Sequence, residues 1–252
     1  MPEKTVKVYN ANAPHPVILV CEHASAFIPA EFNQLGLNDA VAESHIAWDP
    51  GASAVAHFLA NGLNAVLVES TVSRLVYDCN RPPESPTAVP HRSEIYDVPG
   101  NKDLLDGPRN ARAHDYYFPF KHALTQTIAD HTGTPILVTI HSFTPVYHGE
   151  PRDVEIGVLH DSDHRLADAI LNCADQFNVQ RNQPYGPTDG VTHTLELHGL
   201  QNQLLNVMIE IRNDLITTAT SQKSVATHLQ RWIETALSSL ESIDMPQSKG
   251  AV

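Results

Sequence analysis

The sequence contains few cysteines and no long apolar segment. Only Cys21, Cys79 and Cys173 occur among its 252 residues, and no two of them have the close spacing of a metal-binding pair. No stretch approaches the roughly 20 apolar residues that cross a bilayer, and residues 1–10 lack a basic segment followed by an apolar one. We therefore expect a cytoplasmic protein with reduced thiols and no membrane partner.

Basic residues are also scarce. The chain has 16 Lys and Arg residues against 29 Asp and Glu residues, which gives a net charge of −13. Such a charge opposes binding to phosphate backbones, so we do not expect nucleic acid as a partner. The length and the 42% hydrophobic content suffice for one large core. We expect a single domain over residues 1–252, with a flexible tail from about residue 246.

Strand-like and helix-like segments alternate along the chain. Runs rich in Val, Ile and Leu predict buried strands at residues 16–20, 64–69, 135–141, 154–159 and 205–211. Helical spacing of apolar residues predicts helices at residues 54–63, 119–131, 165–177 and 221–243. This alternation predicts an α/β fold, a three-layer α/β/α sandwich with a mixed, mainly parallel sheet.

Ionisable side chains stand at the ends of three of these strands. His23 follows the first strand, His141 ends the third, and Glu210 lies near the end of the last. A buried ionisable group is costly unless it is paired, bound to a metal or used in chemistry. Open α/β sheets place their sites at the carboxyl ends of the strands. We therefore expect a metal site with His23 and His141 as two ligands and Glu210 as the general base that activates water.

The third metal ligand is either Glu22 or Asp49. Spacing does not decide between them, but adjacent residues of an extended strand point to opposite sides, so Glu22 should face away from His23. We favour Asp49 for this reason. The alternative for Asp49 is a plain cap at the amino end of the helix that follows it.

Three arginines lie in or beside the expected site segments: Arg74, Arg81 and Arg212. Arginine binds carboxylates in bidentate fashion, and Arg81 is our first choice for a substrate carboxylate. Arg212 has the alternative of pairing with Glu210 or another carboxylate at the sheet edge. Asp78 is expected either to cap the proline-rich loop at residues 79–90 or to orient Arg81.

A second group of histidines occurs at residues 192–198. The segment alternates polar and apolar residues, as an edge strand does. We expect a solvated strand face here rather than a second metal site.

Several motifs resemble known metallohydrolases. IHSF at residues 140–143 and EIRN at residues 210–213 resemble the second zinc-histidine strand and the catalytic-glutamate strand of zinc carboxypeptidases, and Asn80-Arg81 resembles the Asn-Arg pair that holds the substrate carboxylate there. A closer resemblance is to the N-formylglutamate amidohydrolase family, over about residues 17–214. It is carried by four motifs in order: EHAS at residues 22–25, WDPGA at 48–52, SRLVYDCNRP at 73–82 and HSFTP at 141–145.

The resemblance implies a carboxypeptidase-like fold and a zinc enzyme, or one using another divalent metal, that hydrolyses a small N-acyl amino acid. The family's reaction converts N-formyl-L-glutamate to formate and L-glutamate. Glu210 is then the catalytic residue. The residues expected to bind substrate are Arg74, Asn80, Arg81, Ser142 and Arg212.

The sequence departs from these patterns at two positions. Carboxypeptidases carry a zinc-binding Glu three residues after the first histidine, but Ala26 stands there. The residue before His23 is Glu22, where proline is more usual in the amidohydrolase family. The departures leave two further functions open: a metallohydrolase of the same fold that acts on a peptide or cell-wall amide, and a binding protein without catalysis. A closed, arginine-lined pocket favours the N-acyl amino acid, whereas an open groove favours the larger amides.

Overall fold

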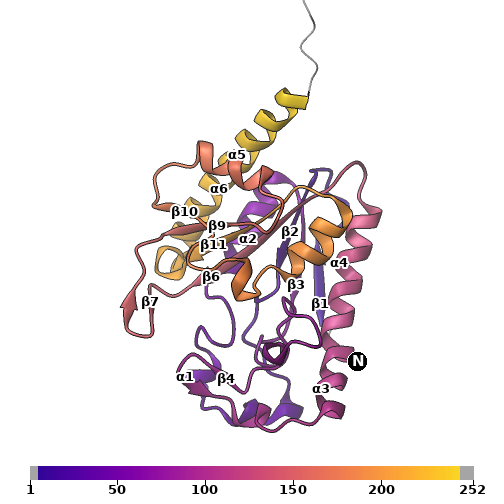
Figure 1. Ribbon diagram of the computed structural model, residues 1–252, viewed down its shortest axis with the longest axis vertical. Coiled ribbons are helices and arrows are strands. Elements are labelled where there is room, and N and C mark those ends of the chain that lie inside the picture. Colours follow the sequence, from indigo (N-terminus) through magenta and orange to yellow (C-terminus); the bar gives the residue numbers. More distant parts are fainter. Residues whose placement is uncertain (1–4, 245–252) are drawn as a thin grey trace, which may run out of the picture.

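A seven-stranded sheet forms the centre of the protein (Figure 1), whose computed structural model describes residues 5–244. The expected tail from about residue 246 lies outside the described residues. The strands lie in the order β1-β3-β2-β6-β11-β9-β10. Their bounds are β1 Val6–Tyr9, β2 Val17–Cys21, β3 Val66–Ser70, β6 Ile136–Phe143, β9 Ile156–Leu159, β10 Val179–Arg181 and β11 Asn206–Arg212.

The sheet is mixed and mainly parallel, as the sequence predicts. The four central strands β3, β2, β6 and β11 run parallel to one another, whereas β1 is antiparallel to β3 and β9 is antiparallel to β11. Because the central strands end at one edge, the residues that end β2, β6 and β11 come together there. The register of β6 and β11 places Glu210 opposite His141.

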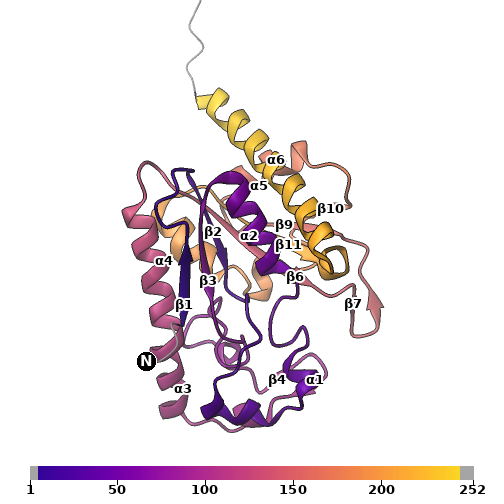
Figure 2. The same ribbon diagram turned by 180° about the vertical axis from the view of Figure 1, so that it is seen from behind.

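Helices cover both faces of the sheet, which confirms the three-layer arrangement. Figure 2 shows two of them, α2 (Ala52–Leu63) and α6 (Ala219–Asp244), in front of the sheet, and α5 (Arg165–Cys173) packs on the same face. The other face is covered by α4 (Phe118–Asp130), the turn at residues 195–199 and the loops between β3 and α3 (Asp106–Arg112). No helix in the described part of the chain is long and apolar enough to cross a membrane.

Alternate residues of the central strands face the two helical layers. On β2, Leu19 joins the core under α2 and α6, and its neighbours Ile18 and Val20 join the opposite core. These strands are buried on both faces, which explains why the sequence shows continuous apolar runs rather than alternation. Because these runs contain few polar residues, an ionisable residue at a strand end is easy to recognise in the sequence.

The expected strands and helices are present, with most ends shifted by one or two residues. The helix expected at residues 165–177 ends earlier, at Cys173, because the backbone of Ala174 is extended (ψ 135°). Pro119 does not break the chain of helical turns around it. A π-helical segment at Ala113–Tyr117 joins α3 to α4, and Pro119 lies in the first turn of α4, directly after this segment.

The prediction of an edge strand at residues 192–198 is wrong. Residues 195–199 form a π-helical turn instead, and the edges of the sheet are β1 and β10. The backbone N–H of Glu196 donates to the carbonyl of Thr192, whose hydroxyl also donates to the Glu196 carboxylate, so local bonds hold the helical conformation. The expected solvated face is wrong as well, because His198 is buried.

Gly51 determines how the chain enters α2. It has a left-handed conformation (φ 83°) at the residue before the helix, directly after Asp49 and Pro50. A Cβ atom at this position would lie 2.6 Å from the carbonyl oxygen of Ile216. Glycine is therefore required both by the backbone angle and by the close approach of another chain segment.

We predict that Gly51→Ala lowers the free energy of unfolding by about 2–4 kcal/mol, the sum of left-handed strain and a steric clash. Gly133→Ala is the matched control, because Gly133 also has a positive φ (90°) but no atom lies within 4 Å of the added Cβ. It should cost only about 1–2 kcal/mol. Urea denaturation of both variants measures the difference, and equal losses would show that contact with Ile216 is no constraint.

Candidate active site

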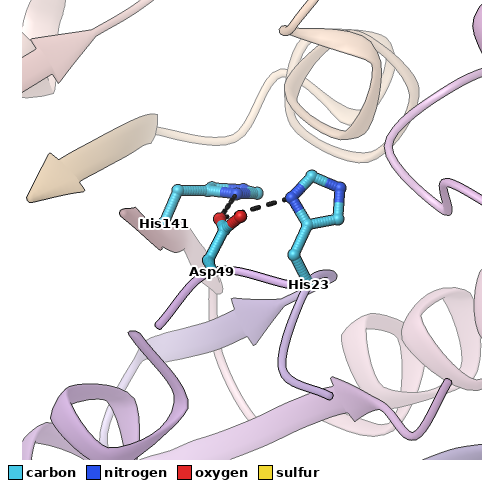
Figure 3. A group of neighbouring side chains, drawn as sticks. All are labelled: His23, Asp49 and His141. Carbon is cyan, nitrogen blue, oxygen red and sulfur yellow. Dashed lines mark hydrogen bonds and ion pairs between the residues drawn. The ribbon is translucent and has the colours of Figure 1, made fainter. Parts of the chain in front are cut away.

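Three buried side chains converge at the carboxyl edge of the sheet: His23, Asp49 and His141 (Figure 3). Nδ1 of His23 lies 3.3 Å from Oδ2 of Asp49, and Nδ1 of His141 lies 2.9 Å from the same oxygen. The three candidate ligand atoms lie within 4.8 Å of one another. Asp49 is 26 residues from His23 and 92 from His141 in the sequence, so only the fold brings this set together.

The far nitrogen of each histidine faces a carboxylate. Nε2 of His23 lies 2.7 Å from Oδ1 of Asp78, and Nε2 of His141 lies 3.1 Å from Oε2 of Glu22. With a metal bound, a carboxylate beside Nε2 would keep the proton on that nitrogen and leave the Nδ1 lone pair for the ion. Two imidazole nitrogens and one carboxylate oxygen form a donor set that fits zinc with a position left for water.

This arrangement separates the two candidates for the third ligand. Asp49 belongs to the cluster, whereas Glu22 lies behind His141 and contacts its far nitrogen. Burial raises the pKa of Asp49, but His23 and His141 outweigh that effect and hold the pKa below its usual range. Asp49 does not cap α2 with its side chain, since Gly51 is the cap residue and no side-chain cap bond forms there.

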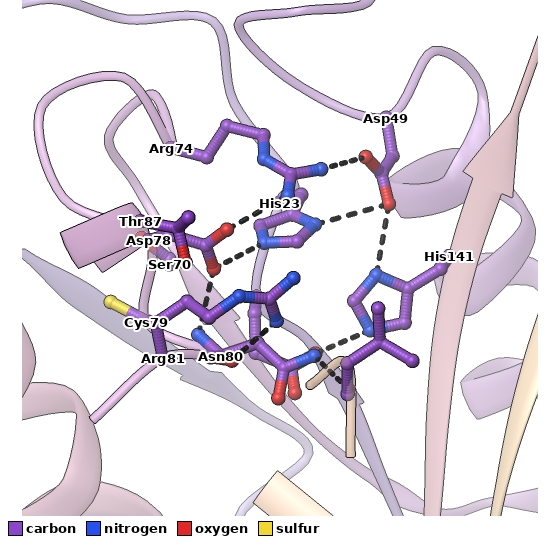
Figure 4. Close-up of polar contacts among 12 residues, drawn as sticks. His23, Asp49, Ser70, Arg74, Asp78, Cys79, Asn80, Arg81, Thr87 and His141 are labelled. Carbon is purple, nitrogen blue, oxygen red and sulfur yellow. Dashed lines mark hydrogen bonds and ion pairs between the residues drawn. The ribbon is translucent and has the colours of Figure 1, made fainter. Parts of the chain in front are cut away.

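Asp78 links the histidine to the neighbouring arginine (Figure 4). Its Oδ2 accepts a hydrogen bond from Arg74 at 2.8 Å, and its Oδ1 accepts one from the backbone N–H of Asn80 at 3.0 Å. Arg74 also lies 3.6 Å from Oδ1 of Asp49. Burial alone would raise the pKa of Asp78, but His23 and Arg74 hold it well below the usual range. Asp78 therefore orients His23, a contact that the sequence did not predict.

Glu210 has a different environment from these paired carboxylates. It is buried, and its Oε2 forms no hydrogen bond with any residue between 5 and 244. Burial raises the pKa of Glu210 to about 7, with Asp49 adding to the shift and His141 opposing it. A carboxylate with a pKa near 7 can both accept and return a proton at neutral pH.

A cavity of about 210 Å³ joins the cluster to Glu210. The volume suits a small molecule rather than a polymer. Its polar and aromatic lining includes four residues that the sequence analysis did not select: His45, Glu94, Tyr147 and Tyr185. None of these ends a predicted strand, so the rule that identified His23, His141 and Glu210 could not find them.

Four of the five expected substrate-binding residues line this cavity: Arg74, Asn80, Arg81 and Ser142. Arg212 does not. Its guanidinium contacts Asp214 at 2.9 Å and Glu155 at 3.5 Å, outside the cavity lining, so the structure shows the expected alternative of pairing with carboxylates at the sheet edge.

The four lining residues differ in how free their side chains are. The amide of Asn80 is used at both ends, since it donates to the carbonyl of Val191 and accepts from the N–H of Thr194. The hydroxyl of Ser142 donates to the carbonyl of Pro50. Arg81 donates to the carbonyl of Asn80 and forms no ion pair within the described residues, so it retains donors for a ligand.

Arg152 organises the aromatic wall of the cavity. It follows a hairpin formed by β7 (Val146–Tyr147) and β8 (Glu150–Pro151). Its guanidinium carbon lies 4.4 Å from the ring centre of Tyr147 and 4.9 Å from that of Tyr185, and Nη1 donates to the Tyr185 hydroxyl at 3.1 Å. Cation–π contact and hydrogen bonding thus fix both tyrosines at the cavity.

The family follows from comparison with known proteins. A family model described as N-formylglutamate amidohydrolase matches residues 15–217. The chain belongs to the N-formylglutamate amidohydrolase family. The matched range contains the His23, Asp49 and His141 cluster and Glu210. Membership confirms the resemblance found in the motifs and implies hydrolysis of an amide bond in a small molecule.

Solved structures also resemble this amidohydrolase. The gene product Atu2144 from Agrobacterium tumefaciens has 55% sequence identity and a TM-score of 0.93, with 95% of this chain and 97% of that chain covered. An N-formylglutamate amidohydrolase from Ralstonia eutropha JMP134 has 18% identity and a TM-score of 0.62, with 94% and 100% covered, and this likeness shows the fold alone. No curated protein sequence matches the chain.

We predict that the amidohydrolase binds one Co²⁺ or Zn²⁺ ion and that Asp78→Asn weakens its affinity roughly 10–100-fold, because the orienting carboxylate behind His23 is lost. Asp97→Asn is the control, since Asp97 is an exposed residue that pairs with Arg92. Visible absorption during Co²⁺ titration measures both affinities. If Asp78→Asn bound the ion as tightly as Asp97→Asn, the carboxylate would not orient a ligand.

Proposed function

We propose that the protein is a metal-dependent amidohydrolase that removes the formyl group from a small N-acyl amino acid, with N-formyl-L-glutamate as the reference substrate. One observation carries the proposal: a buried His-Asp-His cluster shares a small cavity with Glu210, whose Oε2 is unpaired among residues 5–244. The cluster supplies ligands, Glu210 supplies a base, and Arg81 supplies a cation for the substrate carboxylate.

His23, Asp49 and His141 would hold the metal. A zinc ion bound there would polarise the formyl carbonyl and lower the pKa of water. Other divalent ions also accept two imidazoles and a carboxylate.

Glu210 moves the proton in this mechanism. Its carboxylate accepts a proton from the attacking water and then delivers it to the nitrogen of the leaving amine. Arg74, held by Asp78 and Asp49, presents a fixed positive charge at the cavity wall, where negative charge develops on the carbonyl oxygen. Arg81 holds the substrate carboxylate and so orients the amide for attack.

The cavity favours this function over the two alternatives. A volume of about 210 Å³ matches an N-acyl amino acid more closely than an extended peptide or a cell-wall strand. The cluster and Glu210 are all present, which argues against a binding protein on a decayed enzyme. The cytoplasmic location stays a prediction.

We expect Glu210→Gln to retain the bound metal while kcat for N-formyl-L-glutamate falls by roughly 10²–10⁴-fold, because the amide cannot accept the proton. Formate release and metal content should be measured on the same preparation. Near-normal turnover in the variant would show that another group is the base.

We expect Arg81→Ala to raise KM about 10–100-fold with a smaller effect on kcat, because a charge-assisted hydrogen bond to the substrate carboxylate contributes roughly 1.5–3 kcal/mol. Arg92→Ala, which removes an exposed arginine outside the cavity lining, is the control. A fall in kcat at unchanged KM would assign Arg81 to the chemical step instead.

A further inference from the structure

A second polar pair lines the same cavity. Nε2 of His45 lies 2.6 Å from Oε2 of Glu94, and both residues belong to the lining. Glu94 occupies the turn between β4 (Arg92–Ser93) and β5 (Tyr96–Asp97), with φ 51°. Although such a turn lies at the surface, the Glu94 side chain is only 15% exposed. The Glu94 side chain therefore lines the cavity rather than extending into bulk solvent.

The proposed reaction uses neither residue. The metal is assigned to His23, Asp49 and His141, and the base is Glu210. The contacts of Glu94 therefore concern the part of the substrate that does not react, which is the amino-acid side chain.

The charges in the lining limit what that side chain can be. The lining contains two arginines, Arg74 and Arg81, and Arg74 is already bound by Asp49 and Asp78. Arg81 forms no ion pair with any described residue, so the lining offers one arginine for one carboxylate. A second carboxylate that reached Glu94 would meet a like charge in a partly desolvated cavity, which is strongly unfavourable.

We propose that the His45–Glu94 pair selects N-acyl amino acids whose side chain donates hydrogen bonds, such as a carboxamide or an ammonium group, over those with a second carboxylate. The proposal rests on the function proposed above and narrows its substrate. Oε2 of Glu94 is occupied by His45, and Oε1 remains as an acceptor for an N–H group. A site with a buried acceptor rejects an isostere that lacks the matching donor.

N-formyl-L-glutamine and N-formyl-L-glutamate provide a sharp test, because they differ only in an amide against a carboxylate. We expect the metal-loaded full-length protein to show a kcat/KM for the glutamine derivative roughly tenfold or more above that for the glutamate derivative. Glu94→Gln should remove most of this preference. Asp97→Asn, which removes a carboxylate from the same hairpin but outside the cavity lining, should leave it unchanged.

The outcomes separate this inference from the proposed function. A preference for N-formyl-L-glutamate, or a ratio that Glu94→Gln does not change, overturns the inference and leaves the hydrolase intact. If neither compound is hydrolysed, the proposed function fails, and calorimetric binding of free L-glutamine and L-glutamate to wild type and Glu94→Gln still decides the side-chain preference. Tighter binding of glutamine that is lost in Glu94→Gln supports the inference, and equal binding overturns it.

Discussion

The site depends on the sharing of one carboxylate oxygen by two histidines. Oδ2 of Asp49 faces Nδ1 of both His23 and His141 and also accepts a hydrogen bond from the backbone N–H of Ser142. A buried carboxylate without such partners would be too costly to keep ionised. Because His23 follows β2 and both His141 and Ser142 belong to β6, the spacing and parallel direction of these strands are tied to the geometry of the cluster.

The remaining buried carboxylates near the cluster differ in what they contact. Glu22 and Asp78 each face the far nitrogen of one histidine, and Arg74 balances Asp78 and Asp49. Glu210 forms no hydrogen bond through Oε2 within residues 5–244, and burial raises its pKa to about 7. One set of acidic residues thus serves two purposes: the paired members hold a donor set rigid, and the unpaired member remains able to take a proton.

Loops complete what the sheet begins. The segment after β3 carries Arg74, Asp78 and Arg81, and the amide of Asn80 ties it to residues 191–194. The Arg152 contacts fix the aromatic wall, and the turn that carries Glu94 closes another part of the lining. In the proposed mechanism, His141 and Glu210 therefore act from strands at the sheet edge, while the residues assigned to the rest of the substrate lie on loops.

The sequence by itself determined the alternation of strands and helices, the parallel character of the sheet and the three ionisable groups at strand ends, because burial leaves a local pattern of apolar residues. The ordered motifs also identified the family. The tertiary structure alone decided that Asp49 rather than Glu22 joins the histidines, that Asp78 orients His23, and that Arg212 lies outside the cavity. It also revealed the His45–Glu94 pair. These contacts join residues far apart in the chain, and no local periodicity records which distant side chains a fold brings within hydrogen-bonding distance.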